Sequence, residues 1–143
     1  AQDGAETIFT LSSSPTRGAR PGKAVTSVAV WRQLLQVSAQ FHTSYMVYVN
    51  RCGNEDGLTF GGGSMVVDPF GRVIAEMPAL EPGMAVVEVS DEVLRRARTA
   101  YPLLRDERLS LVHRELDRVR RRRYDLPDPE PGDESGDAPA EPR

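Results

Sequence analysis

The sequence has little cysteine and little histidine: one cysteine, Cys52, and two histidines, His42 and His113. One cysteine cannot form a disulfide within the chain, which fits the reducing cytosol. These three side chains also lack the spacing of a zinc site. We therefore expect no metal-binding residue.

Long apolar runs are absent as well. None approaches the roughly 20 residues that a membrane-spanning helix needs, and no basic segment followed by an apolar one marks a signal peptide. Hydrophobic residues make up 39% and charged residues 27% of the 143 residues, as in a soluble globular protein. We expect a cytoplasmic protein with no membrane partner.

The net charge of −3 is unevenly distributed along the chain. Residues 125–143 contain seven acidic residues, one arginine and five prolines, so they carry −6 and leave +3 for the other 124 residues. Such a segment cannot bury enough apolar surface to offset its ordering entropy. We predict one folded domain over residues 1–124 and a disordered, acidic, proline-rich tail over residues 125–143.

Apolar residues in the first 124 positions recur with the periods of strands and helices. The pattern predicts an α+β fold, with strands at 7–11, 45–49, 64–67, 72–76 and 84–89 and helices at 25–43, 90–99 and 106–123. The segment 50–63 contains five glycines and is predicted to be a loop. Asp68-Pro69-Phe70-Gly71 is predicted to be a turn, because proline fixes φ and glycine accepts positive φ.

Two of these elements should pack together. The predicted helix 25–43 has a wide apolar stripe, which indicates a helix lying on a sheet. Its members are Val30, Leu34, Val37 and Phe41, with Trp31, Leu35 and Ala39 beside them. The run 45–49 is almost continuously apolar, which implies cover on both faces of that strand.

Three motifs in fixed order follow the second strand: Asn50-Arg51-Cys52-Gly53-Asn54-Glu55, then Gly62-Gly63-Ser64, then Asp68-Pro69-Phe70-Gly71. Their order and spacing resemble the C-terminal half of a nitrilase-superfamily carbon–nitrogen hydrolase, similar to amidases and N-carbamoyl amidohydrolases. The likeness covers roughly residues 1–110. It implies part of a four-layer α-β-β-α sandwich, a small amide, ureido or nitrile substrate, a cysteine thioester intermediate, no cofactor and a homo-oligomer.

The same resemblance places the family's catalytic Glu, Lys and Cys upstream of the matching region. We therefore expect no catalytic residue in this chain and an inactive chain on its own, with the nucleophile before Ala1. Cys52 occupies a variable position of its motif, and no predicted helix follows it to lower its pKa. We interpret it as a small residue filling a loop.

The resemblance implies four substrate-pocket residues: Ser13, Ser14, Asn50 and Glu55. Each also has a purely structural interpretation. The two serines can cap nearby backbone groups, Asn50 can simply end a strand, and Glu55 can lie in a solvated loop. For Arg51, pairing with a carboxylate is favoured over substrate contact.

The small-molecule substrate that the resemblance implies is compatible with two other patterns, which argue against phosphate binding and nucleic acid. Gly61 to Ser64 lack the Lys-Ser/Thr ending and following helix of a phosphate loop. The run Arg120 to Arg123 has no interleaved aromatic residues and fits a solvated helix end. Two alternative functions stay open: a glutaminase-like module that supplies ammonia, and a non-catalytic interaction protein of the same fold. Uncovered strands around 46–49 should also promote association.

Overall fold

A computed structural model of the protein describes residues 1–17 and 25–126. The chain divides into two units, Ala1–Asp106 and Glu107–Arg143. The first unit combines a sheet with helices, which confirms the predicted α+β class. The predicted tail, apart from its first two residues, lies outside the described residues, so the domain prediction stays a prediction.

The main sheet has four strands in the order β1-β2-β5-β6. They are β1 (Thr7–Ser12), β2 (Tyr45–Asn50), β5 (Met65–Val67) and β6 (Val73–Glu76). β1 and β2 are parallel, with Thr7 opposite Tyr45 and Ser12 opposite Asn50. The remaining pairs are antiparallel. Four of the five predicted strands are therefore confirmed.

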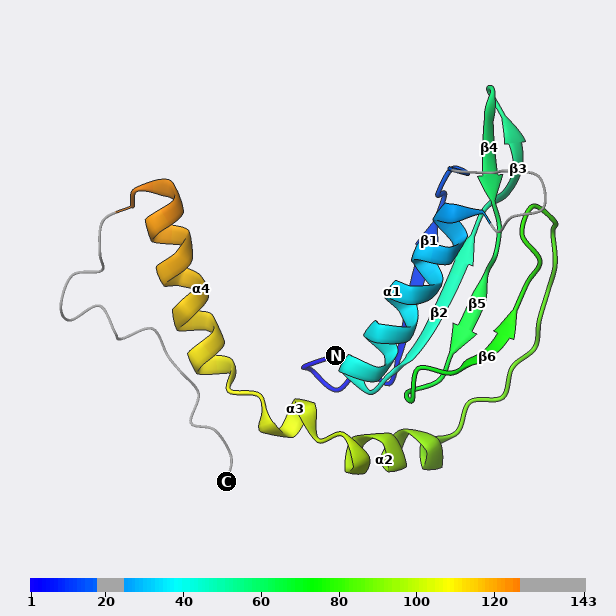
Figure 1. Ribbon diagram of the computed structural model, residues 1–143. Coiled ribbons are helices and arrows are strands. Elements are labelled where there is room, and N and C mark those ends of the chain that lie inside the picture. The colour runs from blue at the N-terminus through cyan, green and yellow to red at the C-terminus, as the bar shows by residue number, and fades with distance from the viewer. Residues whose placement is uncertain (18–24, 127–143) are drawn as a thin grey trace. The chain divides into compact units, whose positions relative to one another are not determined.

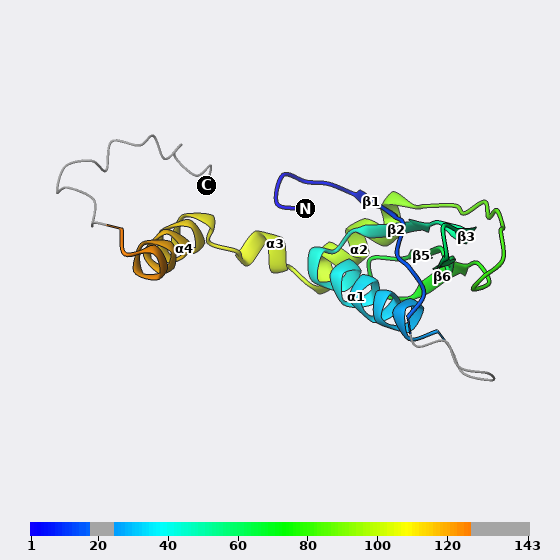
Figure 2. The same ribbon diagram turned by 90° about the horizontal axis from the view of Figure 1, so that it is seen from above.

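Helix α1 (Thr26–His42) connects β1 to β2 and lies along one face of the sheet (Figures 1 and 2). It confirms the predicted helix 25–43. The buried core joins helix and sheet and consists of Leu35, Ala39, Met46, Tyr48, Met65 and Val67, with Trp31 packed against it. The face that packs is thus the one that carries Trp31, Leu35 and Ala39.

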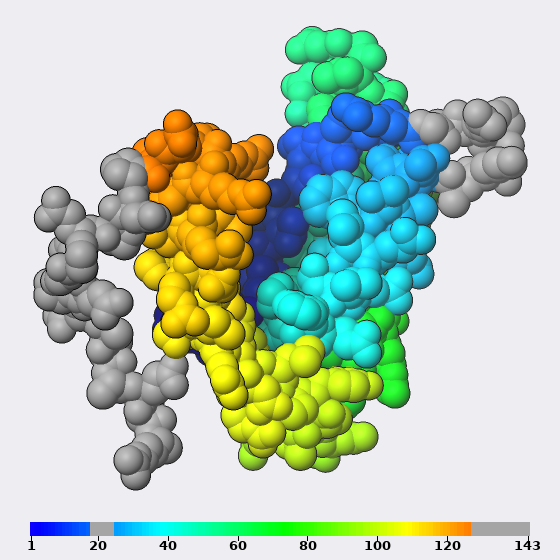
Figure 3. Space-filling model, turned by 60° about the vertical axis from the view of Figure 1, so that its left-hand side comes forward, coloured from blue at the N-terminus to red at the C-terminus, as the bar shows by residue number. Residues whose placement is uncertain are grey.

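The other apolar side of α1 is exposed. The residues singled out by spacing, Val30, Leu34, Val37 and Phe41, are 48–66% exposed. The surface of α1 is coloured light blue to cyan in the space-filling view (Figure 3). The helix therefore carries apolar residues on both sides, and only one side meets the sheet.

The sheet face opposite α1 is also open. Its side chains alternate with those of the core along β1 and β2. They include Phe9 and Leu11, which are 67% and 77% exposed, and Val49, which is 47% exposed. The predicted cover on both faces of β2 is therefore incomplete among the described residues: on this face Tyr45 is buried, but Val49 is exposed.

The turn between β5 and β6 is confirmed. The Asp68 carboxylate Oδ1 accepts hydrogen bonds from the backbone N–H groups of Phe70 and Arg72, each at 2.9 Å. Gly71 has a φ of 78°, which a side chain would disfavour. These contacts reverse the chain so that Val73–Glu76 pairs with β5.

The predicted loop 50–63 is wrong. Residues Cys52–Glu55 (β3) and Leu58–Gly61 (β4) form an antiparallel hairpin that projects beyond the main sheet (Figure 1). Its two turn residues, Asp56 and Gly57, have φ values of 48° and 77°. Positive φ at both positions is the geometry of a type I′ turn, for which Asp-Gly is a preferred pair.

The predicted strand 84–89 is wrong as well. The segment joins no ladder among the described residues, and Met84 and Val86 are 89% and 93% exposed. Its composition favours a strand, but a strand also needs a neighbouring edge to satisfy its backbone groups. The described part of the chain supplies none at this position.

Two helices end the first unit. Helix α2 (Asp91–Ala100) begins after Ser90, whose Oγ accepts from the N–H of Glu92 at 3.2 Å. This N-cap confirms the predicted helix start. The Tyr45 hydroxyl donates to the Ser90 carbonyl at 3.2 Å and thereby ties this helix start to β2. The short α3 (Leu103–Asp106) follows.

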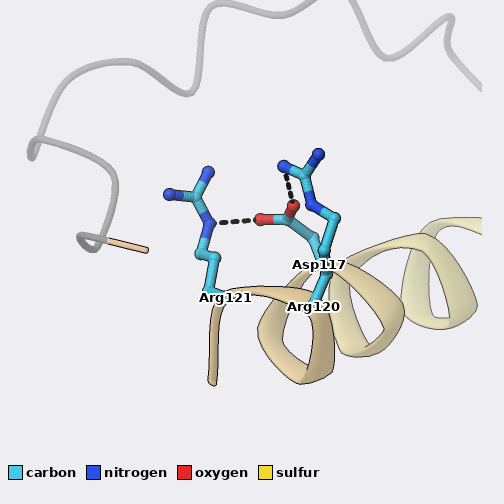
Figure 4. Close-up of polar contacts among 3 residues, drawn as sticks. All are labelled: Asp117, Arg120 and Arg121. Atoms are coloured by element: carbon cyan, nitrogen blue, oxygen red, sulfur yellow. Dashed lines mark hydrogen bonds and ion pairs between the residues drawn. The ribbon is translucent and has the colours of Figure 1, made fainter. Parts of the chain in front are cut away.

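The second unit contains helix α4 (Leu109–Tyr124), which begins three residues later than predicted because 103–106 form α3. Asp117 pairs with Arg120 at 2.8 Å and Arg121 at 2.5 Å (Figure 4). The hydrogen bond from Arg121 is the main cause of a lowered pKa of Asp117. No helix within residues 1–17 and 25–126 is long and apolar enough to span a membrane.

Candidate functional site at the ends of the parallel strands

Polar side chains gather where the two parallel strands end. Ser12 ends β1 and lies opposite Asn50, which ends β2. Ser13 and Ser14 follow Ser12 directly, and Ser64 precedes β5, the neighbour of β2. Since parallel strands end at the same edge of a sheet, residues far apart in sequence meet here. We call Ser12, Ser14, Tyr48, Asn50 and Ser64 the strand-end cluster.

Asn50 lies at the centre of the strand-end cluster. It is only 8% exposed. Its side-chain oxygen accepts from the N–H of Ser14 at 2.9 Å, and its side-chain nitrogen donates to the Gly62 carbonyl at 2.9 Å. Its backbone N–H donates to Ser64 Oγ at 3.0 Å. Asn50 thus joins three segments of the chain.

Hydroxyl groups continue the cluster. The N–H of Ser14 also donates to Ser12 Oγ at 3.1 Å. The Tyr48 hydroxyl donates to the same Ser12 oxygen at 3.5 Å. Burial raises the pKa of Tyr48, and the hydrogen bonds to Ser12 and Ser14 lower it by less. Tyr48 is therefore a neutral phenol at neutral pH.

The four predicted pocket residues do not form one group. Ser14 and Asn50 are in direct contact, and Ser13 is exposed beside them. Glu55 instead lies on the β3–β4 hairpin, where it forms an ion pair with Arg51. The hydrogen bond that Arg51 donates within this pair is the main cause of the lowered pKa of Glu55. The pairing agrees with the structural interpretation that was favoured for Arg51.

Arg51 has a second contact. Its guanidinium carbon lies 4.5 Å from the centroid of the Phe60 ring, within the range of a cation–π interaction. Phe60 is buried on β4. Arg51 therefore links the two strands of the hairpin, and Glu55 is held by the same guanidinium.

Cys52 lies in β3 opposite Gly61 and is half-buried. None of the described residues forms a hydrogen bond to its thiol. The residues after it continue β3, so no helix N-terminus stabilises a thiolate there. Within residues 1–17 and 25–126, no three His, Cys, Asp or Glu side chains are placed to hold a metal ion.

Sequence reasoning missed Ser12, Tyr48 and Ser64 as members of the cluster. The alternation of side chains along β2 could have found Tyr48, because residues two apart in a strand share a face. Ser12 and Ser64 could be found only through the sheet order, which brings β1 and β5 to the two sides of β2. The resulting cluster offers neutral donors and acceptors but no acid–base pair.

Most of the first unit matches the model of a known protein family. Residues 1–99 match the family model described as carbon-nitrogen hydrolase. The chain is 46% identical over 83 residues to an (R)-stereoselective amidase of a Pseudomonas species, covering 57% of this chain and 30% of that protein. It is 39% identical over 83 residues to a deaminated glutathione amidase of Escherichia coli, covering 56% and 29%.

The fold agrees with the sequence match. An amidase of the nitrilase superfamily from Nesterenkonia superposes with a TM-score of 0.57 at 29% identity, covering 80% of this chain and 36% of that one. This likeness confirms the predicted nitrilase-type fold. The chain spans about 30% of the length of the two curated amidases it matches. The protein belongs to the carbon–nitrogen hydrolase family.

Proposed function

We propose that this chain forms part of the substrate-binding wall of an enzyme that hydrolyses a non-peptide C–N bond. The substrate would be a small amide, ureido compound or nitrile. The observation that supports this most is the strand-end cluster, in which neutral polar groups lie at the ends of parallel strands. An uncharged amide is bound by such donors and acceptors rather than by an ion pair.

In the proposed reaction with an amide, a cysteine thiolate attacks the carbonyl carbon and the C–N bond breaks. The nitrogen leaves as ammonia after it gains a proton, and a thioester is left. Water then hydrolyses the thioester to the acid. The reaction needs a nucleophile, a proton carrier and an oxyanion stabiliser, each acting on a different atom.

We propose that none of these three roles falls to a residue of this chain. Cys52 is the only thiol of the sequence, and its place in β3 offers neither a base nor a helix N-terminus to activate it. Ser13 and Ser14 would stand beside the substrate, with Asn50 behind them. The exposed hairpin would carry Glu55 at the edge of the pocket.

A chimera tests this proposal. The matching 83-residue segment of the Pseudomonas amidase would be replaced by the corresponding residues of this chain. Ammonia release from that enzyme's own amide substrate should persist, since the grafted wall belongs to the same family. Complete loss of activity in a folded chimera would contradict the proposal. Glutamine as a second substrate tests the glutaminase alternative.

Cys52 provides the matched control. Cys52→Ala in the chimera should leave ammonia release unchanged. The 143-residue chain by itself should release no ammonia from small amides. Turnover by the chain that disappears in Cys52→Ala would show that Cys52 is the nucleophile and would overturn our assignment.

A further inference from the structure

We propose that Asn50 is a positioning residue that fixes two segments of the site relative to each other and does not contact substrate itself. The two segments are the turn that follows β1, Ser12–Pro15, and the segment Gly61–Ser64 that connects β4 to β5. This inference rests on the proposed function, because it assigns Asn50 a role within the same site.

The oxygen and the nitrogen of the Asn50 carboxamide are each hydrogen-bonded to one of these segments. Its oxygen accepts from the N–H of Ser14, and its nitrogen donates to the carbonyl of Gly62, each at 2.9 Å. The backbone N–H of Ser14 can only donate and the carbonyl of Gly62 can only accept. One orientation of the amide therefore satisfies both partners, and the flipped orientation satisfies neither.

Burial separates Asn50 from solvent and from substrate. The residue is 8% exposed, whereas Ser13 beside it is exposed. A side chain whose two polar ends are both bonded to backbone gains nothing from turning toward a ligand. Turning away would leave the buried Gly62 carbonyl without this bond and the Ser14 N–H with only its longer bond to Ser12 Oγ. Asn50 thus acts on the substrate through the segments that it holds.

The Gly61–Ser64 segment needs such a fixed point. Gly62 and Gly63 have φ values of 59° and 68°, so the backbone takes a left-handed course at two successive residues. Gly62 also donates its N–H to the Arg51 carbonyl at 3.0 Å. The bond from Asn50 fixes the opposite side of the same residue, its carbonyl. Both hydrogen-bonding groups of Gly62 are therefore anchored to residues 50 and 51.

Asn50→Asp in the 143-residue chain tests the assignment. A protonated aspartic acid has the shape of asparagine, accepts from the Ser14 N–H and donates an O–H to the Gly62 carbonyl. An ionised one places a negative oxygen against that carbonyl. Burial raises the pKa of such a carboxyl above its ordinary range. The variant should therefore regain both bonds as the pH falls.

The measurement is hydrogen–deuterium exchange by mass spectrometry at pH 7.5 and pH 4.5, corrected for intrinsic rates. At pH 7.5, peptides covering Ser12–Pro15 and Gly61–Ser64 should exchange at least about tenfold faster in Asn50→Asp than in the native chain. At pH 4.5 the difference should disappear. The native chain at both pH values accounts for the titration of neighbouring Glu55; Arg51 stays charged and Tyr48 stays neutral over this range, since the pKa of each is raised.

Asn54→Asp is the matched control. Asn54 lies on the exposed hairpin and accepts from the Thr59 hydroxyl at 2.7 Å. This change should leave exchange of the two segments within about twofold of native at both pH values. An Asn50→Asp chain that exchanges like the native one at pH 7.5, or that is unfolded at both pH values, would overturn the inference.

The two proposals can fail separately. The exchange experiment needs no substrate and no turnover, so a negative result removes the role of Asn50 and leaves the proposed hydrolysis standing. An inactive chimera with a normal exchange pattern would count against the proposed function alone.

Discussion

Trp31 of α1 stacks on Tyr48 of β2, with ring centroids 4.9 Å apart and 24° between the ring planes. Tyr48 is 1% exposed and belongs to the core between α1 and the sheet. Its hydroxyl reaches Ser12 at the strand-end cluster. The pair therefore connects the packing of the helix on the sheet with the position of the site.

Replacing the ring should cost more than removing the hydroxyl. We expect Tyr48→Leu to lower the free energy of unfolding by about 2 kcal/mol, since it loses the stacked pair and leaves unfilled volume. Tyr48→Phe keeps the ring and should cost about 0.5 kcal/mol, because the lost hydrogen bond is long. Urea unfolding followed by the fluorescence of Trp31, the one tryptophan of the sequence, measures both. Equal losses would show that the stacking contributes nothing.

Gly63 has both a backbone and a packing reason to be glycine. Its φ is 68°, and a Cβ there would lie 2.7 Å from Cγ1 of Val28 on α1. Gly57 has a φ of 77°, and a Cβ there would meet no atom within 4 Å. Gly57→Ala should thus cost about 1 kcal/mol for conformation alone, and Gly63→Ala about 3 kcal/mol. Thermal and urea unfolding check the difference.

A second substitution isolates the clash at Gly63. When Val28→Ala is added to Gly63→Ala, it removes the two methyl groups that would clash with the new Cβ at residue 63. The free energy of unfolding lost in the double variant should be about 1 kcal/mol smaller than the sum of the losses in the two single variants. Additivity within error would mean that only the backbone conformation makes residue 63 intolerant of a side chain.

Regular periodicity made the core of the fold predictable. The β1-α1-β2 order follows from a β-branched run, a helical apolar stripe and a second apolar run in the sequence. The stripe did not show which side of α1 faces the sheet. Val30 and Trp31 are adjacent and both apolar, and the choice of Trp31 comes from its fit against Tyr48. A tertiary contact decided what helical period alone could not.

The errors have separate causes. Five glycines in 50–63 favoured a loop, although Asp56-Gly57 between two short runs is a hairpin signal in its own right. The strand predicted at 84–89 has the right composition, but pairing depends on a neighbouring edge that local sequence cannot reveal. Similarly, Ser14 and Asn50 are 36 residues apart and meet only because their strands are neighbours.

The Arg51–Glu55 pair gives a pH prediction for the hairpin. The hydrogen bond from Arg51 lowers the pKa of Glu55. A carboxyl with a lowered folded-state pKa favours the folded hairpin above the unfolded-state pKa, and this contribution is lost as the pH falls through the folded-state pKa. In Arg51→Met, the midpoint of Glu55 should move up toward its ordinary value. A carbon-detected NMR titration of the Glu55 side chain measures the shift.

The same titration, repeated at several salt concentrations, tests the ion pair itself. An unchanged Glu55 midpoint would contradict the pairing in solution. The pair is exposed on both sides, so high salt should weaken the difference between native and variant.

The open face of the sheet predicts association of the 143-residue chain. Leu11 is 77% exposed and lies opposite Val49 across the β1–β2 pair, and an apolar surface of this kind gains free energy when it is covered. Leu11→Lys should weaken self-association by about tenfold, since it removes a side chain whose burial is worth about 1.5–3 kcal/mol. Light scattering during size-exclusion chromatography over a concentration series measures the effect.

Val37→Lys is the matched control, because Val37 is 66% exposed on the outer side of α1. A larger effect from Val37→Lys would place the contact on the helix, and a native chain that is monomeric with a sharp melting transition would refute the prediction.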